Sequence, residues 1–200
     1  WRQAGDIVMP AAFFLMLATV FAIAMQGRVT AEAGTGVIWV GALLSLFLAS
    51  PSLYQQELRD GMLEQLFLQM QSFEIYVLIR TVLLCVLTGV PLLLCVPIGM
   101  MFLGLSWQVL PVLMPALLIG IAATCALMSF AASVMLGYGQ APLVRIGIVL
   151  PMCIPVVIFG VAASQENAQA LGWLAAYFFL LLPVTVWAGS QAIRAQLAES

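Results

Sequence analysis

The sequence predicts an all-α integral membrane protein that crosses a bilayer six times. Of its 200 residues, 64% are hydrophobic and only 7% are charged, and the mean hydropathy is +1.17. A soluble domain carries about a quarter charged residues. The apolar residues form continuous runs, whereas the strands of a membrane barrel alternate between apolar and polar residues over about ten positions. Helices are therefore favoured over a barrel.

Six apolar runs, separated by polar or turn-rich breaks, define the expected spans. Each is close to the roughly 20 residues that a helix needs to cross about 30 Å of hydrocarbon. The predicted spans are Ile7–Met25, Val37–Leu53, Arg80–Leu103, Val109–Met135, Ile146–Ala163 and Leu171–Ala188. The third and fourth are long, which predicts tilted or kinked helices. Together they form a single permease-sized domain over residues 1–200.

The arginines predict that both chain termini face the cytoplasm. Cytoplasmic loops carry an excess of basic residues. One side of the predicted membrane has Arg2, Arg59, Arg80, Arg145 and Arg194, and the other has Arg28. The same topology places Trp39, Trp107 and Trp173 at the outer boundary and Tyr54, Tyr138 and Trp187 near the inner one, as expected of aromatic belts.

The charge and residue usage exclude several classes of function. A formal charge of −2, with six arginines and no lysine, leaves no basic surface for a nucleic acid. The missing lysine removes the phosphate-binding residue of a Walker A loop, and the missing histidine removes the commonest metal ligand. We therefore expect no catalytic residue, no metal site and no nucleotide site in this chain. The cysteines lie in apolar runs without CxxC spacing and are interpreted as small buried hydrophobic residues: Cys85, Cys95, Cys125 and Cys153.

The spans carry no ionisable residue near their centres, where a charge costs at least about 2.5 kcal/mol. This argues against a proton or ion pump. The polar residues that remain inside the spans are Thr88, Thr124, Ser129, Ser133 and Thr185. Small residues at Gly89, Gly120, Ala123 and Ser129 predict close approach of neighbouring helices.

The one substantial polar segment, residues 54–72, is predicted to form a cytoplasmic amphipathic helix. Helical spacing places Leu58, Met62, Leu63, Leu66, Phe67 and Met70 on one arc and Glu57, Asp60 and Glu64 on the opposite stripe. A helix that lies on an anionic inner leaflet carries basic residues instead. The acidic stripe therefore favours docking on a basic soluble partner; a merely solvated face is the alternative. Gly61 allows either a bend between two short helices or a flexible turn.

Prolines inside the predicted spans remove backbone hydrogen bonds. The candidates for a kink or hinge are Pro91, Pro97, Pro151 and Pro155. A static kink and a moving hinge are both compatible with the sequence.

Three stretches of the sequence resemble the haem exporter protein B, or CcmB, family. They are the run Asp60-Gly61-Met62-Leu63-Glu64-Gln65-Leu66, the start of the second span at Gly36-Val37-Ile38-Trp39-Val40, and the pattern Leu150-Pro151, Ile154-Pro155 and Ile158-Phe159 in the fifth span. Two departures stand out. Family members carry an amphipathic helix before the first span, which this sequence, beginning at Trp1, is expected to lack. The loop between the fifth and sixth spans also looks shorter than in the family.

The resemblance implies an ABC-2-type (type V exporter-like) permease fold in the bacterial inner membrane, with the mitochondrial inner membrane as the alternative. The implied function is haem export, or ATP-driven release of a haem-loaded chaperone, in cytochrome c maturation. ATP is then bound by a separate ATPase subunit, CcmA, and further implied partners are CcmC, CcmD and the haem chaperone CcmE. Haem is handled by the complex, since this chain has no histidine to ligate it. The residues expected to couple to the ATPase are Glu57, Arg59, Asp60, Gly61, Leu63, Glu64, Gln65 and Leu66.

Two other functions stay open at this point. One is a membrane scaffold of a haem-handling complex that passes no substrate, and the other is an unrelated secondary transporter or channel. The acidic segment favours the first two functions over the third, because a channel has no need of it. An ATPase dimer offers two docking grooves, which two copies of this chain, or one copy and a different membrane subunit, could fill.

Overall fold

The computed structural model describes residues 2–26, 29–49, 73–135, 142–165 and 167–199, and all of its regular structure is helical. The described elements are α1 (Arg2–Ala24), α2 (Ala31–Ala49), α5 (Phe73–Leu84), a π-helical turn η1 (Cys85–Gly89), α6 (Val90–Phe102), a 3-10 turn η2 (Trp107–Val109), α7 (Leu110–Val134), α8 (Pro142–Ala163) and α9 (Ala168–Glu199). The prediction of an all-α protein is confirmed for these residues.

Four helical stretches among the described residues are long and apolar enough to cross a membrane. They are Ala31–Leu48, Glu74–Phe102, Trp107–Val134 and Ala168–Ala195. The first and fifth predicted spans coincide with α1 and α8, whose apolar stretches are the shorter Val8–Ala24 and Val149–Ala163. The structure therefore supports a multi-pass membrane protein, and the count of six spans stays a prediction.

Several helices extend beyond the predicted spans. The third begins at Phe73 rather than Arg80, and the last runs to Glu199 rather than Ala188. Hydropathy marks only the apolar part of a helix, so polar turns that continue the same helix fall outside the predicted bounds. Glu74 and Arg194 lie in these additional helical turns.

Short polar side chains and one glycine set the helix ends that lie away from the chain termini. Thr30 Oγ1 accepts a hydrogen bond from Ala33 N (3.3 Å), and Asn167 Oδ1 accepts from Gln169 N (3.1 Å), as N-cap residues do. At the end of α6, Gly104 has φ +68°, and the amide of Leu105 donates to Met100 O (3.0 Å). This is the Schellman arrangement that ends a helix on a left-handed glycine.

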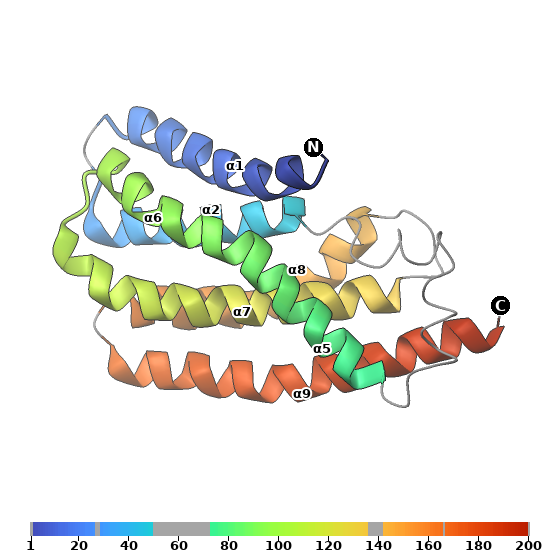
Figure 1. Ribbon diagram of the computed structural model, residues 1–200. Helices are drawn as coiled ribbons and strands as arrows, with labels where there is room; N and C mark the ends of the chain where they lie inside the picture. The colour runs from blue at the N-terminus through green and yellow to red at the C-terminus, as the bar shows by residue number, and fades with distance from the viewer. Residues whose placement is uncertain (1, 27–28, 50–72, 136–141, 166, 200) are drawn as a thin grey trace.

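The helix α7 lies in the middle of the bundle. Fifteen of its 25 residues are buried, and it contacts α2, α5, α8 and α9. In Figure 1 it runs between α1 at one edge and α9 at the other. Small residues make this possible: a Cβ on Gly120 would come within 2.4 Å of Trp39, and one on Gly89 within 2.8 Å of Ile121. The predicted role of these glycines in close packing is confirmed.

The indole of Trp39 fills a socket between α7 and α8, so its predicted place in the outer aromatic belt is wrong. Only 1% of the residue is exposed. A Cβ on Gly160 would lie 2.4 Å from the ring, on Gly120 equally close, and Nε1 donates to Ser164 Oγ (3.0 Å). Both glycines lack a side chain, so the ring can reach the core, while Trp107 and Trp173 remain mostly exposed.

Buried hydroxyl groups inside the helices are satisfied by the backbone. The hydroxyls of Thr81, Thr88 and Thr124 each donate to the carbonyl four residues earlier, at 2.7–2.8 Å. Such bonds remove the cost of a polar atom in an apolar interior. These threonines therefore have a packing explanation and do not by themselves mark a polar pathway.

Candidate functional site

The predicted ATPase-coupling residues lie outside the described part of the chain, but the helices on either side of them are described. Those residues are Glu57, Arg59, Asp60, Gly61, Leu63, Glu64, Gln65 and Leu66. The preceding α2 ends, and the following α5 begins, at the end of the bundle where the N and C termini lie (Figure 1). The segment that contains the predicted coupling residues is joined in sequence to these two helix ends.

The first turn of α5 is tied to α9 by an ion pair. Arg194 Nη2 lies 3.1 Å from Glu74 Oε1, and the hydroxyl of Ser190 donates to the same oxygen (3.3 Å). Both charged side chains are about one-third exposed, at 36% for Glu74 and 35% for Arg194. Gly189 lets α9 approach both neighbours here, because a Cβ on it would lie 2.9 Å from Ser133 Oγ of α7 and 3.5 Å from Val77 of α5.

Exchanging the charges of this pair tests whether the contact stabilises the fold. Glu74→Arg and Arg194→Glu are each expected to lower the free energy of unfolding by about 1 kcal/mol, since a partly exposed pair is screened by solvent. The double exchange is expected to recover most of that loss. Thermal unfolding of the four proteins in one detergent measures it. If the double variant lost the sum of the two single losses in free energy of unfolding, the pairing of the two charges would be contradicted.

The third helical rod changes its packing partners at η1. Before this π-helical turn, α5 contacts α9 and α7; after it, α6 contacts chiefly α1, and to a smaller extent α2 and α7. In Figure 1 the rod crosses the bundle diagonally, from beside α9 to beside α1. The turn itself lies against α7, where Gly89 faces Ile121. The α5 half of the rod therefore packs on the α9 side of the bundle and the α6 half on the α1 side. The π-turn joins the two halves.

Pro91 gives a physical reason for the π-turn. A proline has no N–H for the carbonyl four residues earlier and its ring collides with that carbonyl in a regular helix. For Pro91 this carbonyl belongs to Leu87, inside η1. The wider π-turn moves this carbonyl away from the proline ring. Such π-bulges are frequent at functional sites.

The other proline candidates lie inside helices without a comparable turn. Pro97 is within α6, and Pro151 and Pro155 are within α8. The hydroxyl of Tyr177 in α9 donates to Met152 O (2.8 Å), between the two prolines of α8. This bond holds α8 against α9 between the two prolines.

Two cysteines meet at the π-turn. The side chains of Cys85 in η1 and Cys125 in α7 are neighbours, and Thr88 is also close to Cys125. Both thiols are free. Among the described residues, no three His, Cys, Asp or Glu side chains are grouped as metal ligands would be.

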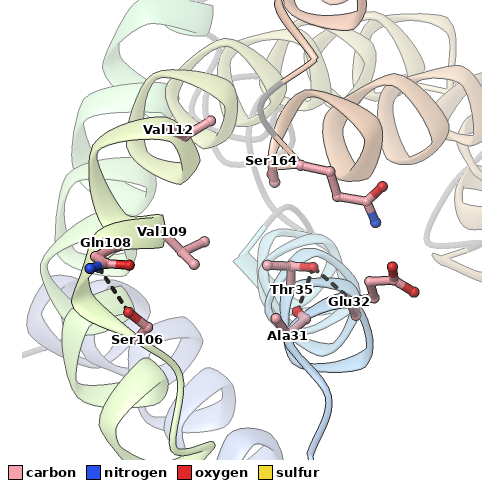
Figure 2. A pocket seen from close by; sticks show the side chains of 9 residues that line it. Ala31, Glu32, Thr35, Ser106, Gln108, Val109, Val112 and Ser164 are labelled. Carbon is pink, nitrogen blue, oxygen red and sulfur yellow. Dashed lines mark hydrogen bonds between the residues drawn. The ribbon is translucent and has the colours of Figure 1, made fainter.

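A pocket of about 280 Å³ opens at the end of the bundle opposite the termini. It is formed by the start of α2, by η2 with the start of α7, and by the turn after α8. The lining residues are Ala31, Glu32, Thr35, Ser106, Gln108, Val109, Val112, Ser164 and Gln165. Figure 2 shows Thr35 in the middle, with Glu32 on one side and Ser106 and Gln108 on the other.

Sequence reasoning missed the ion pair, the π-turn and this pocket. Glu74 and Arg194 are 120 residues apart, and no local pattern pairs them. Pro91 did signal an interruption of the helix. Thr30, Ser106 and Asn167 are typical N-cap residues that could have fixed the helix starts near the pocket.

Apolar helices of this length define an integral membrane protein that crosses the bilayer several times. The chain belongs to the CcmB protein family, whose family model matches residues 1–197. It is 28% identical to heme exporter protein B of Pseudomonas aeruginosa, over 100% of this chain and 93% of that protein. It is 31% identical to heme exporter protein B of Paracoccus denitrificans, over 98% and 94%. With heme exporter protein B of Escherichia coli K12, identity is 37% over 46% and 43% of the two chains.

Proposed function

We propose that this chain is the membrane permease subunit of an ABC transporter for cytochrome c maturation, with six spans and both termini in the cytoplasm of a bacterial cell. Family membership supports the proposal, since its relatives are named heme exporters. All regular structure in the described residues is helical, which is compatible with an ABC-2-type permease. The cargo is haem, or a haem-loaded chaperone that the complex releases.

ATP is bound and hydrolysed by a partner, CcmA, and not by this chain. A sequence without lysine has no Walker A residue to grip a phosphate. The complex also contains CcmC, CcmD and the chaperone CcmE, and haem is ligated by these partners, since this chain lacks histidine, one of the usual axial ligands. Two copies of this chain, or one copy beside another membrane subunit, meet the ATPase dimer.

The observation that carries the coupling proposal is the change of packing partners at η1. Residues 54–72 join directly onto α5, whose first turn is held to α9 through Glu74. A displacement of this segment by the ATPase moves α5 together with α9 and α7. Helix α6 packs chiefly on α1 and only lightly on α7, so it stays with α1 and the π-turn absorbs the difference. Nucleotide-driven closure is thus converted into relative movement of two groups of membrane helices.

Reversing the charges of Asp60 and Glu64 tests this function. The double variant Asp60→Lys with Glu64→Lys is expected to retain about tenfold less ATPase subunit on purification. The acidic stripe predicts a basic docking groove on that subunit, and the new lysines would repel it. Cytochrome c maturation should fall with it. Glu199→Lys, at the end of the last helix, is the control for added positive charge and is expected to behave as the native protein.

The outcomes separate the two parts of the proposal. Loss of both assembly and maturation identifies residues 54–72 as the docking element, and retained assembly with lost maturation identifies them as a coupling element. Unchanged assembly and maturation would refute the assignment of this segment.

A further inference from the structure

The described lining of the pocket opposite the termini carries a negative charge. Its nine lining residues include one carboxylate, Glu32, and no arginine. The arginines whose side chains the structure describes, Arg80 and Arg194, belong to α5 and α9 near the other end of the bundle. Among the described residues, a phosphate or carboxylate placed inside would meet the Glu32 carboxylate and no cationic side chain. A cationic group would meet Glu32.

The hydrogen bonds at the floor of the pocket leave acceptors facing it. Thr35 and Ser164 are 2% and 4% exposed. The Thr35 hydroxyl shares its proton between Glu32 O (2.9 Å) and Ala31 O (3.0 Å). The Ser164 hydroxyl donates to Gly160 O (2.8 Å) and already accepts from Trp39 Nε1 (3.0 Å). A hydroxyl has a single proton and two lone pairs, so Ser164 Oγ can accept one more hydrogen bond and Thr35 Oγ1 up to two, and a ligand that bonds to either oxygen must donate.

The size and the surroundings of the pocket indicate a lipid head group. About 280 Å³ is just below the range of about 300–1,000 Å³ typical of pockets for whole small molecules. Val109 and Val112 line the side formed by α7, and Trp107 beside them is 57% exposed. Exposed tryptophan at the end of a membrane helix marks the level of the head groups.

We propose that this pocket binds the primary ammonium group of an aminophospholipid, such as phosphatidylethanolamine, from the leaflet at this end of the bundle. Three N–H donors match the Glu32 carboxylate and the oxygens of Thr35 and Ser164. The lipid phosphate stays outside in water, and the start of its chains lies along Val109 and Val112. The proposal requires only that the bundle is embedded in a membrane and does not depend on the transported cargo.

Phosphatidylcholine provides the discriminating comparison, because it has the same phosphate and positive charge but no N–H donor. Native mass spectrometry of the protein from nanodiscs with equal amounts of the two lipids, matched in acyl chains, measures retention. The native protein is expected to retain phosphatidylethanolamine about tenfold over phosphatidylcholine. Glu32→Gln should abolish that preference. Glu74→Gln is the same chemical change at the opposite end of the bundle and should preserve it.

Free ethanolamine and choline distinguish a lipid from a soluble amine as the source of the ammonium group. Ethanolamine, but not choline, is expected to displace bound phosphatidylethanolamine from the native protein. Thermal unfolding verifies that Glu32→Gln remains folded. Equal retention of both lipids by the native protein and by Glu32→Gln would overturn the proposal. Binding of ethanolamine that depends on Glu32, without any preference between lipids, would overturn the lipid as its source.

Discussion

Gly160→Ala is expected to destabilise the protein by about 1–2 kcal/mol, and Gly160→Val by about 3 kcal/mol, through overpacking. The new Cβ would lie 2.4–2.7 Å from three atoms of the Trp39 indole. The ring has little room to move, because Gly120 is equally close to the same edge of the ring and Nε1 donates to Ser164 Oγ. The steric cost exceeds the gain of up to about 1 kcal/mol in helix propensity from replacing glycine.

A matched control lies in the same helix. Gly147 also belongs to α8, but a Cβ there meets nothing within 4 Å. Gly147→Ala is therefore expected to be neutral or slightly stabilising. In a Trp39→Leu background the cost of Gly160→Ala should disappear, because the ring atoms that it strikes are gone. Thermal unfolding in a single detergent measures all of these variants. If Gly147→Ala lowered the stability as much, or if Gly160→Ala cost as much in the Trp39→Leu background, the tight packing of the indole against Gly160 would be contradicted.

The sequence predicted what depends on local hydropathy and failed where distant helices meet. Where the structure describes them, the predicted apolar runs coincide with helices, because burial in lipid needs only a continuous apolar stretch. Trp39 looked like a belt residue because it stands near the start of a span. Its burial depends on two glycines in other helices, Gly120 and Gly160, which no pattern around Trp39 can indicate.

The candidate site could be predicted only in part, for the same reason. The proline at 91 marks a lost backbone bond, but the π-turn also requires α5 and α6 to pack on different partners. The floor of the pocket consists of Thr35 and Ser164, whose side chains converge only after α2 and α8 pack together. Small polar residues of this kind are common at helix ends, so their types alone indicate no site.

Mercuric ion is expected to block the ATP-driven cycle of the complex by bridging Cys85 and Cys125. Each thiol would lose a proton and form one sulfur–mercury bond, fixing η1 to α7. Since the proposed movement passes through this turn, the ATP-dependent step should fall at least about tenfold, as expected when one of two conformations is trapped. Binding of the ATPase subunit should be unchanged, because the bridge lies in the membrane interior.

The other two cysteines must first be removed, as Cys95→Ser and Cys153→Ser, so that one pair remains in this chain. In that background Cys85→Ser and Cys125→Ser should each restore activity in the presence of mercury, and an excess of dithiol should reverse the block. Mass spectrometry of the intact chain counts the bound ions. Two ions per chain would contradict the proximity of the thiols. One bridging ion with full activity would show that the π-turn does not move during the cycle, leaving Pro91 as a fixed kink.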